Sequence, residues 1–153
     1  MNLKMSSTYF YIILALLAGA MMPTQAATNN KMADFVNGPI LSAFISFFVG
    51  TAALLMYILI SGTSLGGIAG ARNAPAIAWI GGFLGAFFVA SAVTLVPKLG
   101  VALTFSLIVA GQMLVTLIID HFGFLGVPVK EVSLARIGGV LLITLGVILI
   151  RRF

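Results

Sequence analysis

The chain has 153 residues, of which 61% are hydrophobic and only 7% are charged, with a formal net charge of +5 and no cysteine. A soluble globular protein has about 25% charged residues, so this composition excludes a soluble domain. The basic residues are scattered along the chain and form no basic stripe, so they do not predict a nucleic-acid partner.

The charge-free stretches are long enough to cross a bilayer, which takes roughly 17–25 apolar residues in a helix. The sequence therefore predicts an all-α polytopic membrane protein with a single transmembrane domain over residues 1–153. We expect the five spanning helices at 9–29, 39–60, 76–96, 101–120 and 134–150. These spans leave no room for a separate soluble domain.

The first predicted span has two interpretations. Lys4, the apolar run that follows it and the small residues near Ala26 have the pattern of a cleaved secretory signal peptide. As a retained helix, the segment would contain Pro23, which frees a backbone carbonyl. It would also place Gln25 and Asn29 on one face, at i and i+4.

The second span is expected to begin with Asn37 as its N-cap and Pro39 in its first turn. Ser42, Ser46 and Gly50 then recur every fourth residue. Small residues at this spacing let helices approach closely, so the pattern favours a packing face, with a cavity lining as the alternative.

The glycine-rich segment 61–75 predicts a flexible linker between the second and third spans. Trp79 opens the third span, where an aromatic anchor at the membrane interface is expected. The segment 97–100 predicts a tight turn before the fourth span.

In the fourth span, Gln112 and Thr116 lie one turn apart on one side of the helix. Gln112 is close to mid-span, where an unpaired amide is costly. We therefore predict a solute-binding site at Gln112 and Thr116, with Asn29 and Gln25 as partners. The alternative is a structural hydrogen bond across helices.

Asp120 continues the same side of the fourth span but lies near its end, about 12 Å along the axis from Gln112. Asp120 and His121 are therefore assigned to an outer gate or a cation-attracting vestibule. The alternative is a solvated or capping carboxylate beside an interfacial histidine. His121 is the only histidine, and no cluster of acids accompanies it, so we expect no metal and no cofactor.

The fifth span is expected to be capped by Ser133, with Arg136 in its first turn and 151–152 closing it. Gly139 and Gly146 lie two turns apart on one face and remove side-chain bulk, which predicts a helix contact between two copies.

The basic residues divide equally between the two sides of a five-span bundle. Lys4, Arg72, Lys130 and Arg136 fall on one side, and Lys31, Lys98, Arg151 and Arg152 on the other. The positive-inside rule then gives no preferred orientation. Either the count misses a weak bias, or the chain inserts both ways and pairs as an inverted dimer. The dimer would reproduce the inverted-repeat plan of many transporters.

Several segments resemble the YdcZ-type family of proposed inner-membrane exporters, five-helix members of the drug/metabolite transporter superfamily. The resemblance covers about 19–150 and is carried by the segments "QAATN", "SFFVG", "WIGGFLGAFFV", "PKLGVALTFSLIVAGQ", "IDHFGFLG" and "RIGGVLLITLGVIL". The last segment is also similar to the terminal helix of small multidrug resistance transporters. That similarity implies a dimer contact at Gly139, Leu142, Ile143, Gly146 and Val147.

The resemblance implies a multi-pass protein of the bacterial inner membrane, whose relatives occur as dual-topology singles, as opposed pairs or as fused ten-helix chains. It also implies that the first span is retained and that this chain is half of a ten-helix transporter. The small multidrug transporters carry a central glutamate in their first helix. Here that helix has no acid, so proton-coupled cation export is not implied.

The functional hypothesis is a carrier for a small molecule, working as an antiparallel homodimer by alternating access. Without charge at mid-span, its site would suit neutral or weakly polar solutes. The alternatives are a passive channel and a non-transporting accessory subunit of a membrane complex. Nothing resembles a nucleophile elbow, a phosphate loop or paired catalytic carboxylates, so an enzyme is not expected.

Overall fold

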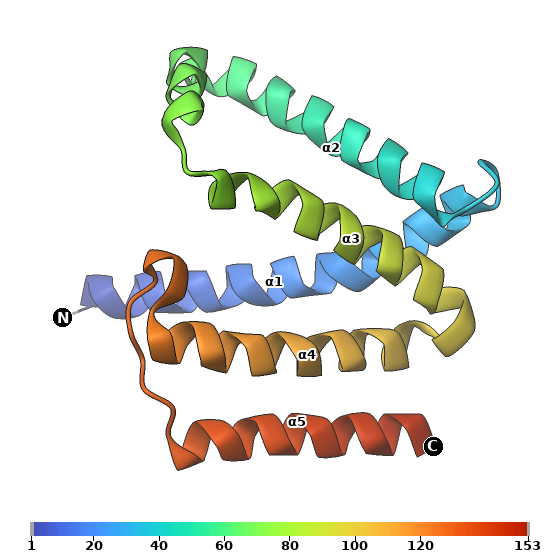
Figure 1. Ribbon diagram of the computed structural model, residues 1–153, viewed down its shortest axis with the longest axis vertical. Coiled ribbons are helices and arrows are strands. Elements are labelled where there is room, and N and C mark those ends of the chain that lie inside the picture. The colour runs from blue at the N-terminus through green and yellow to red at the C-terminus, as the bar shows by residue number, and fades with distance from the viewer. Residues whose placement is uncertain (1, 153) are drawn as a thin grey trace. The chain divides into compact units, whose positions relative to one another are not determined.

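The computed structural model describes residues 2–152, with side chains for 8–152, and over this range it is all-α (Figure 1). The long helices are α1 (Asn2–Ala33), α2 (Pro39–Ser61), α3 (Ala76–Leu99), α4 (Val101–Phe122) and α5 (Leu134–Arg152). Two 3₁₀ helices, η1 (Leu65–Asn73) and η2 (Phe124–Gly126), lie in the connections. All five long helices are long and apolar enough to cross a membrane. The prediction of an all-α chain with five spanning helices is confirmed.

The helices are longer than the apolar runs that predicted them. Four of them begin at the predicted residue and continue for one to three residues beyond the predicted end. The first helix extends past its apolar run in both directions and passes through Pro23 without a break. Backbone hydrogen bonding therefore continues into the polar interface, where hydropathy no longer marks the helix.

The connection between α1 and α2 differs from its prediction. Asn37 does not cap α2, because it adopts a left-handed backbone conformation with φ 59°. The N-cap is instead Gly38, which makes no side-chain hydrogen bond, and Pro39 begins the helix as expected. Asparagine tolerates positive φ better than most residues, so Asn37 serves the turn rather than the cap.

The predicted flexible linker contains regular structure. The 3₁₀ helix η1 occupies nine residues of it, and the Ser64 hydroxyl accepts a hydrogen bond from the Gly66 backbone N–H. The predicted turn at 97–100 is shorter than expected, since α3 runs through Pro97 and only Gly100, at φ 78°, separates α3 from α4. Few residues can adopt that φ, which explains the glycine.

By its contacts the chain divides into two units, residues 1–97 and 98–153, which are described separately. In the first unit, a buried cluster joins α2 and α3. It consists of Ala43, Val89 and Val93, with Ala33, Phe88 and Ala90 packed against it. The cluster lies where the end of α1, the start of α2 and the second half of α3 meet (Figure 1).

In the second unit, α4 and α5 lie side by side and antiparallel (Figure 1). Val140 and Val147 of α5 and Thr104 of α4 are its buried side chains within the described range. The Thr104 hydroxyl donates to the Gly100 carbonyl at 2.7 Å, so its burial leaves no unpaired donor. Ser133 caps α5 by accepting a hydrogen bond from the Arg136 N–H at 3.3 Å, which confirms its predicted role.

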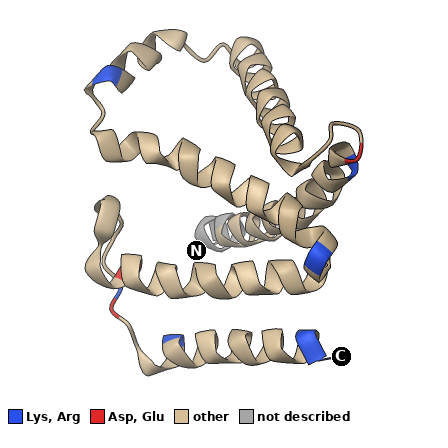
Figure 2. Cartoon of the chain, turned by 45° about the vertical axis from the view of Figure 1, so that its right-hand side comes forward, with Lys and Arg blue, Asp and Glu red and all other residues tan. Residues whose placement is uncertain are grey.

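Charged residues of the described range lie at helix ends and in the connections, with none along the middle of a span (Figure 2). In the most apolar 18-residue stretch of each span, between 6% and 17% of the residues are buried inside the protein. Most large apolar side chains therefore point outward, as expected where the surroundings are lipid rather than water.

The buried cluster makes a prediction about packing. Ala43 is 6% exposed on α2, and filling such a site costs about 1–3 kcal/mol through overpacking. We expect Ala43→Leu to lower the thermal unfolding midpoint of the detergent-purified protein. The control is Ala52→Leu, the same change at an exposed position of α2, which should leave the midpoint unchanged. Equal midpoints for the two variants would contradict this packing.

Candidate functional site

A groove of about 430 Å³ lies between α1 and α2 in the first unit. Its α1 side is formed by Met21, Thr24, Gln25, Thr28, Asn29 and Met32, and its α2 side by Ser42, Ile45, Ser46 and Val49. Six of these ten side chains are polar, although both helices are predominantly apolar. The groove is therefore the candidate site for a solute within this unit.

Two hydrogen bonds cross from one helix to the other in this groove. The Ser42 hydroxyl donates to the Asn29 backbone carbonyl at 2.5 Å, and the Gln25 amide nitrogen donates to the Ser46 hydroxyl at 3.3 Å. Gln25 lies one turn before Asn29, and Ser46 one turn after Ser42. The i, i+4 spacing on both helices thus brings the two polar pairs together in one antiparallel register.

Asn29 is a buried polar residue of the groove whose amide nitrogen has no partner. The residue is 7% exposed, and its Nδ2 atom has no hydrogen-bond partner among the described residues. A buried unsatisfied donor costs about 1–3 kcal/mol. Asn29 also borders a narrower cleft that Phe88, Val89 and Ala92 of α3 line. The residue therefore lies among three helices with an amide donor left unused.

The structure brings together two of the predicted solute-binding residues, Gln25 and Asn29. The sequence had favoured a packing role for Ser42 and Ser46, yet both line the groove and bond to α1. Their spacing on α2, matched by that of Gln25 and Asn29 on α1, was the signal in the sequence.

The other two predicted residues, Gln112 and Thr116, belong to α4 of the second unit. Both are exposed, and the Thr116 hydroxyl donates to the Gln112 backbone carbonyl at 2.7 Å. No hydrogen bond from the Gln112 side chain to another part of residues 8–152 is present. Their role in solute binding stays a prediction, as does their partnership with Gln25 and Asn29.

Asp120 and His121 anchor the connection between α4 and α5. The Asp120 carboxylate forms an ion pair with Arg136, which also donates to the Lys130 carbonyl at 2.9 Å. The Lys130 N–H donates to the Asp120 carbonyl at 2.8 Å, and the Val132 N–H donates to His121 Nδ1 at 3.3 Å. This geometry favours a structural role, and the predicted gate or vestibule stays a prediction.

Gly123 lets the same connection fold back on the end of α4. It has φ 64°, and a Cβ atom there would lie 2.7 Å from Cγ2 of Val129, closer than real contacts allow. Among the residues that the structure describes, no three His, Cys, Asp or Glu side chains gather as a metal site would require.

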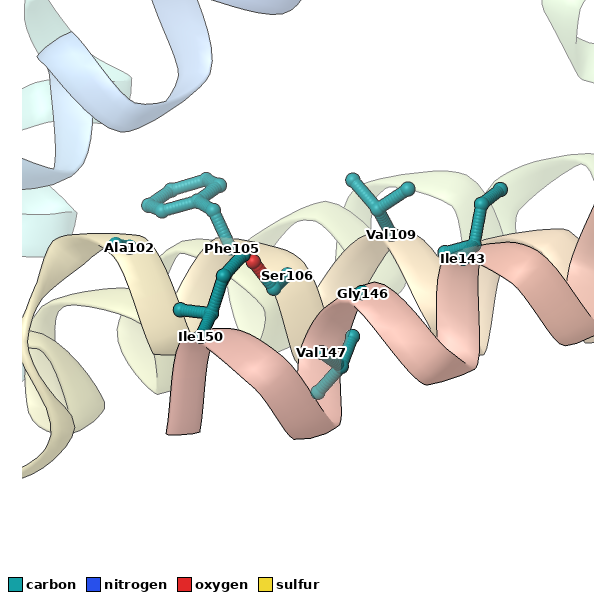
Figure 3. A pocket seen from close by; sticks show the side chains of 8 residues that line it. All are labelled: Ala102, Phe105, Ser106, Val109, Ile143, Gly146, Val147 and Ile150. Carbon is teal, nitrogen blue, oxygen red and sulfur yellow. The ribbon is translucent and has the colours of Figure 1, made fainter. Parts of the chain in front are cut away.

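A second groove of about 350 Å³ lies between α4 and α5 and is almost entirely apolar. Figure 3 shows its lining, which consists of Ala102, Phe105, Ser106, Val109, Ile143, Gly146, Val147 and Ile150. Ile143 and Gly146 of the predicted dimer contact are thus part of this groove. Gly139 and Leu142 are exposed outside it.

Comparison with family models matches residues 10–149 to the family described as "Putative inner membrane exporter, YdcZ". The chain belongs to this family. A search of curated proteins and a search of solved structures give no significant match. Its membership of a family of inner-membrane exporters and its five apolar helices identify this chain as a multi-pass protein of the inner membrane.

The ion pair at the end of α4 makes a prediction. Arg136 and Asp120 are 32% and 22% exposed, so losing their attraction should cost at most about 1 kcal/mol. We expect Asp120→Asn to speed hydrogen exchange of the Lys130 and Val132 amides about two- to fivefold, because local opening becomes easier. Glu131→Gln removes a neighbouring acid that makes no ion pair within the described residues, and is the control. Unchanged exchange in Asp120→Asn would show that the pair does not hold the connection.

Proposed function

We propose that this protein carries a small uncharged or weakly polar solute across the inner membrane by alternating access between two inverted copies of the chain. The family supports an exporter, and the α1–α2 groove supports a solute site within one copy. In this proposal Gln25, Asn29, Gln112 and Thr116 bind the solute, and Asp120 and His121 stand at an outer gate.

The observation that carries the proposal is the unused amide of Asn29. Hydrogen bonds between membrane helices average only about 0.6 kcal/mol, which is less than the cost of leaving a buried donor unpaired. Stability alone therefore does not favour an asparagine whose Nδ2 atom is buried and without a partner. Once the Asn29 side chain turns this buried atom toward the groove, a solute that accepts a hydrogen bond from it removes the cost when it binds.

The inverted pairing is supported by the equal division of basic residues, four on each side of the five spans. Two copies in opposite orientations would supply ten helices, related by an axis in the membrane plane, as inverted-repeat transporters are. The apolar α4–α5 groove, with Gly146 on its α5 side, supports α5 as the place where the copies meet.

Two other functions are compatible with the family, namely a passive channel and an accessory subunit of a larger membrane complex. Saturable uptake with counterflow in proteoliposomes distinguishes a carrier from a channel. Lack of activity in the purified protein, together with co-purification of a larger partner, would instead favour the accessory role.

The proposed inverted pairing makes a prediction about orientation. Two reporters are fused in turn after Phe153 of the native chain, one active only in the cytoplasm and one active only in the periplasm. Both fusions should give signal. Two lysines added after Phe153 should hold that end in the cytoplasm, because small Lys/Arg differences set topology. Two glutamines added at the same place are the control and should leave both signals. A native chain whose reporters work on one side only would rule out dual insertion.

The proposed pairing also makes a prediction about the dimer contact at Gly139, Leu142, Ile143 and Gly146. A Cβ atom at Gly146 would meet nothing within 4 Å in the protomer. Gly146→Leu should therefore leave the protomer folded but weaken its dimer, because added bulk separates two helices that pack through glycine.

The measurement for Gly146→Leu is cross-linking in membranes, with Gly111→Leu as the matched control. Gly111 lies on α4, also has open space around its Cβ position, and is outside the predicted contact. The dimer yield should fall severalfold for Gly146→Leu alone. Equal yields for both variants would remove α5 from the interface.

A further inference from the structure

We infer that the α1–α2 groove selects uncharged solutes that present hydrogen-bond acceptors, chiefly carbonyl oxygens, and that the Asn29 amide is the donor that recognises them. This inference rests on the proposed carrier function and names the chemical class of its solute.

The first step is the inventory of donors in the groove. Three hydroxyl groups already donate to backbone carbonyls, those of Thr24 to Ala20 at 2.9 Å, of Thr28 to Gln25 at 2.9 Å and of Ser42 to Asn29 at 2.5 Å. A hydroxyl has one hydrogen to donate, so these groups can only accept from a solute.

The donors that remain are amides and one hydroxyl. Asn29 Nδ2 has two hydrogens and no partner, and Gln25 Nε2 uses one of its two hydrogens on Ser46. The Ser46 hydroxyl accepts that bond and keeps its own hydrogen. Gln25 and Asn29 lie one turn apart on α1, and Ser46 lies on α2. Asn29 Nδ2 is buried, so its side chain turns toward the groove when a solute accepts from it. These donors match a solute with one or more carbonyl acceptors.

The second step concerns charge. None of the ten side chains that line the groove is ionisable. A solute carrying a full charge would lose its hydration there and meet no opposite charge, which is costly at membrane depth. An uncharged solute meets no such penalty. The groove therefore discriminates against both anions and cations of the same shape.

The third step concerns the apolar part of the lining. Met21 and Met32 of α1 and Ile45 and Val49 of α2 surround the polar pairs. Methionine side chains adapt to different shapes, so this lining suits a hydrocarbon group of variable form. The solute class is thus an amide, or a similar carbonyl compound, that also bears an apolar group.

The test uses matched probes that share one skeleton and differ in charge. N-acetyl-leucinamide is uncharged, N-acetyl-leucine carries a carboxylate, and leucinamide carries an ammonium group, and the phenylalanine compounds form a second series. The chain has no cysteine, so Thr28→Cys places one thiol in the groove. Its reaction with N-ethylmaleimide in the purified, reconstituted protein reports occupancy.

The uncharged probe should slow labelling by a factor of 1 + [L]/Kd, about tenfold at ten times its Kd. The anionic and cationic probes should not slow labelling at the same concentration. Ser106→Cys, in the apolar groove between α4 and α5, is the control and should be unprotected by all three probes. Protection by a charged probe equal to that by the uncharged one, or no protection in either series, overturns the inference.

Asn29→Leu should raise the half-protecting concentration about tenfold, the effect of one lost hydrogen bond of about 1.4 kcal/mol. Asn30→Leu removes an amide from the next position, which does not line the groove, and should leave protection unchanged. If Asn29→Leu does not fold, Asn29→Asp decides, because it keeps the shape and replaces the donor by a carboxylate. It should lose protection by the uncharged probe and gain protection by leucinamide. Unchanged preference in Asn29→Asp overturns the role of Asn29.

Counterflow of radiolabelled N-acetyl-leucinamide in proteoliposomes separates the two proposals. Protection of Thr28→Cys without counterflow would leave the binding site standing and make the carrier function wrong. Counterflow that Asn29→Leu does not alter would leave the carrier standing and make this site wrong.

Discussion

The requirement that polar groups inside a membrane protein find partners within the protein governs this structure. Most threonine hydroxyls in the spans meet it on their own helix. Seven threonines donate to a carbonyl three or four residues earlier, namely Thr24, Thr28, Thr51, Thr94, Thr104, Thr116 and Thr144. Ser42 and Gln25 meet it by bonding across helices, and this fixes the register of α1 against α2. Among the described residues, Asn29 Nδ2 is the buried side-chain atom that has no partner, which is why we propose the solute site there.

The two units offer grooves of similar size and opposite character. The α1–α2 groove is lined largely by hydroxyls and amides, and the α4–α5 groove by aliphatic and aromatic side chains with one serine. An apolar groove beside a glycine suits close contact with another helix, whereas unused donors suit a solute. In the proposed dimer, recognition and assembly would therefore depend on different helices. Variants of Asn29 and of Gly146 should then affect different measurements.

Features set by neighbouring residues could be predicted from the sequence, and features set by pairing between distant residues could not. The five spans follow from hydropathy, and the Ser133 cap follows from one residue before an apolar run. The cap at Asn37 was wrong because a glycine follows it and takes the N-cap position. The ion pair of Asp120 with Arg136 depends on how an intervening connection folds, which no local pattern records. The groove depends likewise on one register between α1 and α2.

The distribution of acids limits how the proposed carrier could be driven. The chain has three acids, Asp34, Asp120 and Glu131, and all lie at helix ends or in connections. A carrier that exchanges protons for solute needs a titratable group that both ligands reach in turn, yet no such group lines the α1–α2 groove. Asp120, at the end of α4, is already paired with Arg136. None of the side chains that line this groove could therefore take up a proton in exchange for a solute bound at Asn29. The same absence of charge that lets the groove accept a neutral amide thus removes the simplest means of coupling its transport to protons.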